Sequence, residues 1–415
     1  MNQYFHYRQD SLFVEGVSLS EIASRFGTPA FVYSRAALTD AFMQYAAVLK
    51  GREHLVCFAV KSNPNLSILK LFASLGAGFD IVSGGELQRV LAAGGEAGKV
   101  VFSGVGKSES EMRLALDAGI LCFNVESEAE LLRLNSVAGV MGKIAPISFR
   151  VNPNVDAKTH PYISTGLKQS KFGVAYTEVL ALYRKAAELP HLRVTGMDCH
   201  IGSQLTDSSP FIAATEKVLQ LVDTLALEGI KLEHLDLGGG LGIRYKDETP
   251  PSIADYANKL LAALAGRSEK LIVEPGRVLV GNAGVLLTRI EYLKPGEEKH
   301  FAIVDAAMND LMRPALYDAY HGILPALLRN GVTKQYEVVG PVCESGDFLG
   351  HARDLSVEQG DFLAIMSAGA YGMSMSSNYN TRPRAVEVMV DGEKASLIRE
   401  RENVEQLFAA EKKYL

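Results

Sequence analysis

Eight short apolar runs dominate the first two thirds of the chain. They lie at residues 55–60, 78–82, 100–103, 121–125, 147–151, 194–200, 235–237 and 271–273. The segments between them carry apolar residues at helical spacing, as at 83–93, 109–118, 127–137 and 211–228. Near-continuous apolar strands that are each followed by a helix indicate a parallel sheet covered on its outer side. Eight such units predict a (β/α)8 barrel of the TIM type.

The pattern changes from about residue 284 onward. Longer strand-like runs follow, among them VLLTRIEYL, HFAIVDA, QYEVVG, DFLAIM and AVEVMV, with turn formers such as Lys294-Pro-Gly and Asp391-Gly between them. We therefore predict three parts: an N-terminal strand segment at 1–29, a barrel at 30–283 and a C-terminal antiparallel β-sandwich or β-barrel domain at 284–415. The N-terminal segment is expected to pack with the C-terminal β domain.

The bulk properties favour a small-molecule partner. The chain has 415 residues, more than the roughly 250–300 at which a single core stops growing. Its net charge of −6 offers no long-range attraction to nucleic acid or an anionic membrane. Residues 1–10 lack the basic and apolar blocks of a secretory signal, and no apolar run approaches a membrane span. We expect a cytoplasmic protein with no nucleic-acid or membrane partner.

Polar residues follow several of the predicted strands. In a barrel, ligand-binding groups lie at the carboxyl ends of the strands, so these positions predict one functional rim. The residues are Lys61 and Asn63 after the first strand, Arg150 and Asn152 at the fifth, His200 at the sixth, Gly238–Gly240 at the seventh and Glu274–Arg277 at the eighth.

Two of these side chains are candidates for chemistry. Lys61 directly follows an apolar strand, where it is either a solvated loop residue or a partly desolvated amine with a lowered pKa that favours imine formation. His200 is either a hydrogen-bonded core histidine or a functional group. Position alone does not choose between these interpretations.

Three loops on the same rim suit a phosphate. The run Gly238, Gly239 and Gly240 allows backbone N–H groups to approach an anion, although a tight turn explains a glycine run equally well. The Glu274-Pro-Gly-Arg277 turn adds a cation, and Ser203 adds a hydroxyl. Glu274 is either a paired carboxylate or a partner for a protonated ring nitrogen.

The cysteines and histidines point away from other chemistries. Cys57, Cys122 and Cys199 lie in apolar runs and are expected to be buried hydrophobes, whereas Cys343 lies in the polar stretch PVCESGD and is a candidate for chemistry. The nine histidines have no Cys or carboxylate neighbours at ligand spacing, so no metal site is expected. No G-x-S-x-G motif follows a strand, which argues against a serine hydrolase.

Five motifs in order resemble one family. AVKSN, HIGSQ, DLGGGLG, EPGR and CESGD together are similar to the fold-type III decarboxylases that use pyridoxal 5'-phosphate, over nearly the whole chain. The resemblance implies a barrel that binds the cofactor and a C-terminal β domain. It differs at AVKSN, where AVKAN is the usual form, but the small serine should leave the lysine unaffected.

The resemblance also assigns roles. It implies that Lys61 carries the cofactor as a Schiff base, that His200 stacks on its ring and that Glu274 meets the pyridine nitrogen. The residues expected around the phosphate are Ser203, Gly238, Gly239, Gly240, Gly276, Arg277 and Tyr371.

Within the family, the resemblance is greatest to members that act on meso-diaminopimelate. These enzymes remove the carboxylate at its D-centre and release L-lysine and CO2, the last step of lysine biosynthesis. The resemblance implies that Cys343 delivers or governs the proton, that the active sites are shared across a homodimer, and that Cys343 and Glu344 come from the partner subunit. The residues expected to bind the rest of the substrate are Arg277, Arg313, Tyr317, Glu344 and Tyr371, with Glu344 on the ammonium group.

Alternatives remain open at this point. An ornithine or arginine decarboxylase of the same fold would place Asp after the cysteine, where this chain has Glu344, and would lack the pair Arg313 and Tyr317. A carboxynorspermidine decarboxylase, an alanine racemase and a non-catalytic regulator of this fold are further alternatives, the last disfavoured by the presence of Lys61 and Cys343. The segment 156–172, which includes HPYISTG, is a candidate lid because it is long and rich in turn formers.

Overall fold

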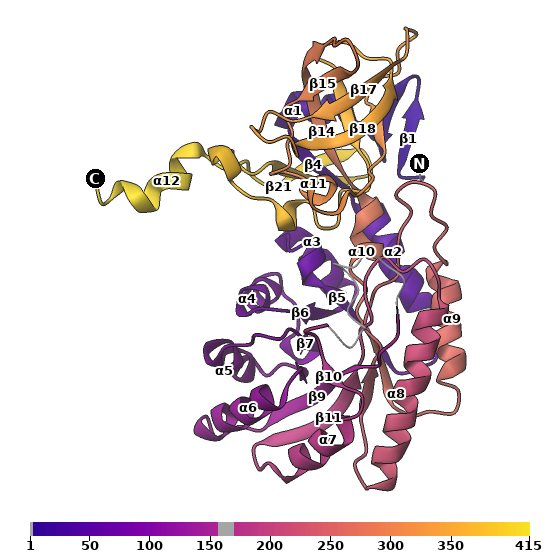
Figure 1. Cartoon of the computed structure of the whole chain (residues 1–415), viewed down its shortest axis with the longest axis vertical. Helices are drawn as coiled ribbons and strands as arrows, with labels where there is room; N and C mark the ends of the chain where they lie inside the picture. The colour runs from indigo at the N-terminus through magenta and orange to yellow at the C-terminus, as the bar shows by residue number, and fades with distance from the viewer. Residues whose placement is uncertain (1–2, 157–169) are drawn as a thin grey trace. The chain divides into compact units, whose positions relative to one another are not determined.

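A computed structural model describes residues 3–156 and 170–415 of the chain (Figure 1). The chain divides into two compact units. The barrel unit comprises Ala41–Ile243 and Thr249–Val278, and the β unit comprises Met1–Asp40, Arg244–Glu248 and Leu279–Leu415. Most of the candidate lid, residues 157–169, lies outside the described residues.

The barrel unit contains a closed parallel barrel. Each of the eight predicted strands is present, and β13 pairs with β5 while β8 pairs with β9, which closes the ring. The predicted (β/α)8 fold is therefore confirmed. A short strand β10 (Val174–Ala175) adds to β9. The barrel strands are β5 (His54–Ala59), β6 (Gly78–Ile81), β7 (Val100–Phe102), β8 (Cys122–Val125), β9 (Ala145–Asn152), β11 (Leu192–Asp198), β12 (His234–Asp236) and β13 (Lys270–Val273).

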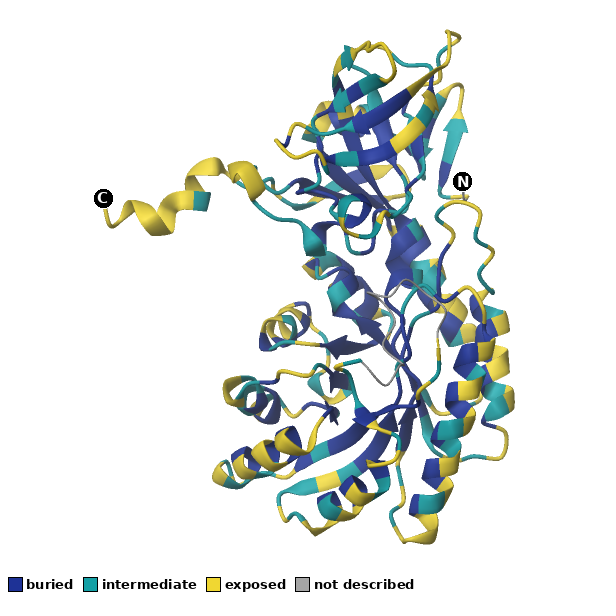
Figure 2. Cartoon of the chain, in the orientation of Figure 1, coloured by how far each residue is buried: buried dark blue, intermediate teal, exposed yellow. Residues whose placement is uncertain are grey.

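Helices surround these strands, and the longer ones have a buried side toward the sheet and an exposed side outward (Figure 2). Several begin at a serine whose hydroxyl accepts a backbone N–H of the first turn, as at Ser83, Ser108 and Ser127. Such caps satisfy N–H groups that have no partner within the helix. The helices are α2 (Arg35–Val48), α3 (Leu66–Ser74), α4 (Gly84–Ala92), α5 (Glu109–Ala118), α6 (Glu128–Val140), α7 (Val179–Glu188), α8 (Ser209–Leu227), α9 (Ile253–Ala263) and α10 (Arg277–Val280).

The barrel core is rich in aromatic and sulfur-containing side chains. Phe102 and Phe123, on adjacent strands, stack with ring centroids 6.1 Å apart. Cys57, Cys122 and Cys199 are buried as expected, and burial raises the pKa of the Cys57 thiol well above its usual value. A buried thiol that stays protonated is a poor nucleophile. These three cysteines therefore serve as core residues rather than as reactive groups.

The β unit is built on a nine-stranded sheet with the main order β18-β17-β15-β14-β4-β20-β21. Most pairings are antiparallel, as predicted, but β15–β17 and β20–β4 are parallel, so the sheet is mixed. Its elements are β4 (Ala30–Ser34), β14 (Gly284–Lys294), β15 (His300–Val304), α11 (Arg313–Tyr317), β16 (Ile323–Pro325), β17 (Lys334–Val339), β18 (Phe348–Leu355), β19 (Phe362–Ile365), β20 (Val386–Asp391), β21 (Lys394–Arg399) and α12 (Val404–Lys412).

The N-terminal segment belongs to this unit in a way that the sequence does not predict. Strands β1 (Phe5–Arg8), β2 (Ser11–Val14) and β3 (Val17–Ser18) form a separate sheet, followed by helix α1 (Leu19–Phe26). It is β4 that enters the large sheet, between β14 and β20. The predicted barrel boundary at residue 30 therefore lies too early, because the buried run AFVYS suits a sheet strand as well as a barrel strand.

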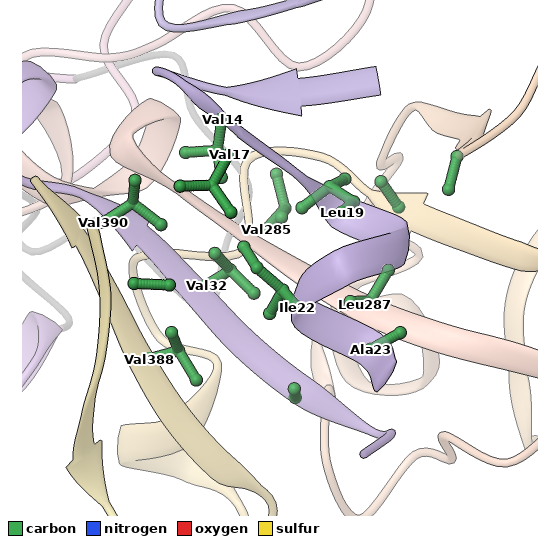
Figure 3. Close-up of a cluster of buried hydrophobic side chains, with 14 of the residues drawn as sticks. Val14, Val17, Leu19, Ile22, Ala23, Val32, Val285, Leu287, Val388 and Val390 are labelled. Atoms are coloured by element: carbon green, nitrogen blue, oxygen red, sulfur yellow. The ribbon is translucent and has the colours of Figure 1, made fainter. Parts of the chain in front are cut away.

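Apolar side chains from these distant segments form one core. Figure 3 shows Val14 and Ile22 beside Val32, Val285 and Val388, all buried. The N-terminal segment thus covers the large sheet mainly through apolar contact, and an isolated antiparallel bridge between Ser11 and Leu327, just after β16, ties the two together. Within the described part of the chain, no helix is long and apolar enough to cross a membrane.

Candidate active site

Lys61 lies in a 3-10 turn, Val60–Ser62, directly after β5. Its Nζ donates a hydrogen bond to Asp80 Oδ2 at 2.8 Å, and Asp80 projects from the adjacent strand β6. The Lys61 side chain is 37% exposed, whereas that of Asp80 is fully buried. The carboxylate thus holds an amine that remains accessible. Sequence reasoning missed Asp80, whose signal was a single acidic residue inside the apolar run GFDIV.

His200 follows β11 and is held as a neutral ring. Its Nδ1 accepts a hydrogen bond from Gly239 N at 3.2 Å, which requires that Nδ1 carry no proton. Burial, together with the charges of Arg150 and Lys61, keeps the pKa of His200 well below its usual value. A neutral imidazole at this rim can stack on an aromatic ring without adding charge.

The three predicted phosphate loops lie against one another. An added Cβ on Gly239 would lie 2.0 Å from Glu274 O, and one on Gly240 would lie 2.3 Å from Gly202 O. Gly240 also has φ +113°, which a side chain would strain. Glycine is therefore required for the close approach of these backbones. Within the loop, the Gly238 N–H donates to Asp236 Oδ1 at 2.9 Å and the Gly239 N–H donates to His200 Nδ1.

The Glu274–Arg277 turn also joins the lysine turn. Arg277 Nη2 donates to Ser203 Oγ at 3.0 Å, and a Cβ on Gly276 would contact Ala59 Cβ at 3.0 Å. Ala59 N donates to Pro275 O at 3.1 Å, which ties the end of β5 to the turn after β13. The structure thus gathers the barrel residues expected to bind the cofactor: Lys61, His200, Ser203, Gly238, Gly239, Gly240, Glu274, Gly276 and Arg277.

Behind this rim, three carboxylates meet inside the barrel. Asp198, Asp236 and Glu274 are buried, and one oxygen of each lies within 4.8 Å of the others. Burial and then the neighbouring carboxylates raise the pKa of Asp236 to about 7, with some opposition from hydrogen bonds, and that of Glu274 well above its usual range. Arg150 Nε lies 4.0 Å from Asp198 Oδ2, so a cation already balances part of the charge.

Glu274 shows whether the site suits a cofactor with a basic ring nitrogen. Its Oε1 is buried and has no hydrogen-bond partner among the described residues. An unpaired buried carboxylate oxygen is costly unless a ligand pairs with it. A protonated pyridine nitrogen is a partner of the right kind, so the residues present fit pyridoxal phosphate.

The remaining expected residues lie in the β unit. Arg313 and Tyr317 are on α11, and Arg313 is buried. Cys343 is exposed, and the neighbouring Glu344 accepts a hydrogen bond from the Tyr379 hydroxyl. Tyr371 is partly buried, with φ +57°. The sequence-predicted site is therefore divided between the two units of the chain.

Comparison with known families defines the class of protein. Residues 35–281 match the pyridoxal-dependent decarboxylase family, in its pyridoxal binding domain. This match covers more than half of the chain, so the chain belongs to the pyridoxal-dependent decarboxylases. The expectation that pyridoxal 5'-phosphate is the cofactor is confirmed.

The similar proteins narrow the class to one enzyme, diaminopimelate decarboxylase. That of Pseudomonas aeruginosa is 60% identical over 98% of both chains, and that of Vibrio cholerae is 57% identical over 98% of both. The crystal structure of the Helicobacter pylori enzyme complexed with L-lysine has a TM-score of 0.92 at 44% identity, covering 95% of this chain and all of that one. The sequence-based prediction of this enzyme is confirmed.

Proposed function

We propose that this chain removes the D-centre carboxylate of meso-diaminopimelate to release L-lysine and CO2, with pyridoxal 5'-phosphate carried on Lys61. The observation that carries the proposal is the combination, on one barrel rim, of an accessible lysine held by Asp80 and a buried Glu274 oxygen that has no hydrogen-bond partner in the described parts of the chain. The first suits covalent attachment of an aldehyde, and the second suits a protonated ring nitrogen.

The barrel residues would hold the cofactor as follows. Lys61 would bind it covalently, His200 would cover one face of the ring and Glu274 would pair with the ring nitrogen. Ser203, Arg277, Gly276 and the loop Gly238–Gly240, with Tyr371 from the β unit, would hold the phosphate. When bound, the cofactor accepts the electron pair that the departing carboxylate leaves behind.

Asp80 positions the reactive amine. Its carboxylate holds the Lys61 ammonium at a fixed place beside the rim and accepts its hydrogen bond when the amine is free. Asp80 also raises the pKa of Glu86, which reaches about 7 mainly through burial. Glu86 is therefore about half protonated near neutral pH, and Asp80 is the acid that keeps the unbound lysine in place for the next turnover.

The substrate is recognised by the centre that does not react. Arg277, Arg313 and Tyr317 bind the L-centre carboxylate, and Glu344 binds its ammonium group, with Tyr371 beside them. A planar guanidinium matches a carboxylate through two parallel hydrogen bonds, which suits selection of a second amino-acid centre. Cys343 supplies or controls the proton that replaces the lost carboxylate.

The same proposal includes a homodimer that works in the cytoplasm. Lys61 belongs to the barrel unit, and Cys343 and Glu344 belong to the β unit. We place Cys343 and Glu344 of one subunit in the active site of the other, so that each site uses both chains.

The decisive experiment compares substrates with and without the L-centre carboxylate. Purified protein with added pyridoxal phosphate should release CO2 from meso-diaminopimelate and form L-lysine, while ornithine should react poorly. Arg313→Ala should lower kcat/KM for diaminopimelate, and the corresponding loss of transition-state stabilisation should be several kcal/mol. A charge-assisted hydrogen bond to a carboxylate is worth roughly 1.5–3 kcal/mol or more. Arg289→Ala, which removes a half-exposed arginine of the same unit, is the matched control. Comparable turnover of ornithine would assign the protein to the ornithine-type enzymes instead.

A further inference from the structure

A buried histidine lies directly beside the proposed substrate arginine. His321 is fully buried, four residues beyond the end of α11. Its Nδ1 lies 2.8 Å from Met366 O, and its Nε2 lies 3.1 Å from Arg313 Nη1. A carbonyl oxygen only accepts and a guanidinium only donates, so Nδ1 carries the proton and Nε2 presents a lone pair to Arg313.

The ring of Tyr245 lies on another side of the same guanidinium. Arg313 Cζ is 4.6 Å from its centroid, a cation–π distance, and Tyr245 also meets His321 edge-on, with centroids 5.2 Å apart. Tyr245 is five residues beyond Gly240, in the segment after β12 that belongs to the β unit. Its backbone N–H donates to Glu248, which fixes the turn.

His321 is itself held from β18. Arg353 Nη2 donates to His321 O at 3.0 Å, and its guanidinium lies 3.8 Å from the ring centroid of Tyr320. The histidine is thus fixed at its backbone and at Nδ1 before it contacts Arg313. These two contacts fix the direction of Nε2, so the position of Arg313 is set by groups that need not touch the substrate.

We propose that His321 is a positioning residue for substrate selection, which holds the Arg313 guanidinium ready to bind the L-centre carboxylate. This inference rests on the proposed role of Arg313. A guanidinium held by a buried acceptor and an aromatic face loses less conformational freedom when the carboxylate arrives, and this raises affinity for ligands that carry this group. Ligands without it gain nothing from His321.

Two substitutions separate the two hydrogen bonds of the ring. In His321→Asn the amide reaches about as far as Nδ1, so it can still donate to Met366 O but cannot reach Arg313. In His321→Gln the amide oxygen reaches about as far as Nε2, so it can accept from Arg313 while the Met366 bond is lost. A residue with a purely structural role would respond to both changes alike.

The measurement is competitive inhibition of the full-length holoenzyme by L-lysine, which keeps the L-centre carboxylate, and by cadaverine, which lacks it. His321→Asn should weaken inhibition by L-lysine about tenfold, equivalent to about 1.4 kcal/mol, and leave inhibition by cadaverine unchanged. The KM for diaminopimelate should rise in step, with a smaller change in kcat. His321→Gln should remain within about threefold of wild type, a difference of roughly 0.7 kcal/mol.

The Arg313→Ala background distinguishes this inference from the function on which it rests. If Arg313→Ala leaves the ratio of the two inhibition constants unchanged, the proposed substrate clamp is wrong. If it changes the ratio but His321→Asn does not, or if Asn and Gln act alike, the clamp stands and the positioning role is overturned. His321→Asn in the Arg313→Ala background should have no further effect on L-lysine. Should the histidine variants not fold, Tyr245→Leu tests the same guanidinium from its other side, and an unchanged ratio there overturns the inference.

Discussion

At the residue scale, the site depends on an accessible amine and on buried carboxyl groups of the barrel. Lys61 is accessible but bound to a buried carboxylate, and one oxygen of the buried Glu274 has no hydrogen-bond partner within residues 3–156 and 170–415. Both were visible in the sequence as charged residues that follow apolar strands. The structure adds Asp80, which explains why the lysine charge has a fixed position rather than a mobile one.

Replacing Lys61 tests where the cofactor is bound. Lys61→Ala should abolish decarboxylation and the visible absorbance of the bound cofactor while the protein stays folded, with a lower melting temperature because the buried Asp80 loses its cationic partner. Borohydride treatment of the wild type, followed by peptide mapping, should find the pyridoxyl group on Lys61. Lys99→Ala, at an exposed ion pair, should keep full activity. A label on any other lysine contradicts the assignment.

His234 provides a pH test of stability that is independent of catalysis. Burial lowers its folded-state pKa to about 4, with smaller contributions from Lys270 and Arg193. In the unfolded chain the histidine has a pKa of ~6.5, so between about pH 6.5 and 4 it is protonated in the unfolded state and neutral in the folded state. The free energy of unfolding therefore decreases as the pH falls through this range. The loss reaches about 2 kcal/mol at pH 5.

The change can be measured by chemical denaturation of the wild type and of His234→Gln at pH 7 and pH 5. The variant does not titrate, so the stability of the wild type relative to the variant should be about 2 kcal/mol lower at pH 5 than at pH 7. An equal difference at both pH values means that His234 is protonated in the folded protein.

At the element scale, the glycine loop after β12 is the part of the rim that leaves least room for a side chain. Gly239→Ala would place a Cβ 2.0 Å from Glu274 O, so the loop must move away from the turn it contacts. We expect the binding free energy for pyridoxal phosphate, measured by titration of the cofactor-free protein, to weaken in Gly239→Ala. The loss should be much larger than the roughly 1 kcal/mol by which an ordinary glycine substitution changes stability. Gly98→Ala, where a Cβ meets nothing within 4 Å, is the control. Equal affinity in the two variants would mean that the loop does not bind the phosphate.

The strands of the barrel could be predicted because a buried parallel strand has a simple pattern. All eight apolar runs became barrel strands, and the polar residues that follow them became the rim. The run AFVYS at β4 has the same pattern, but it pairs with β14 and β20. Hydrophobic pattern reports that a strand is buried on both faces and carries no information about which sheet it joins.

The site was predictable only where a residue type is unusual at its position. Lysine, histidine and glycine at strand ends stood out, whereas Asp198 and Asp236 were overlooked because single acids near strand ends have many uses. The contact between Tyr245 and Arg313 joins residues 68 positions apart, which no local pattern reveals. Which side chains pack together depends on the fold, so positioning residues are less visible in sequence than the groups they hold.

At the scale of the whole molecule, the proposed active site requires two chains. Lys61 lies in the barrel unit and Cys343 in the β unit. In a dimer with an isologous interface, each β unit can meet the barrel of the other subunit, and the two sites are then equivalent. A site with this composition can be tested by mixing two inactive variants.

Lys61→Ala and Cys343→Ala should each be nearly inactive. When equal amounts are unfolded together and refolded, heterodimers should form about half of all dimers. In each heterodimer one site receives both substitutions and the other receives neither, so about a quarter of wild-type activity should return. If Lys61 and Cys343 of a site came from the same chain, every site would keep one defect. A mixture that stays inactive, although differential tags show that heterodimers have formed, therefore rules out sites shared between subunits.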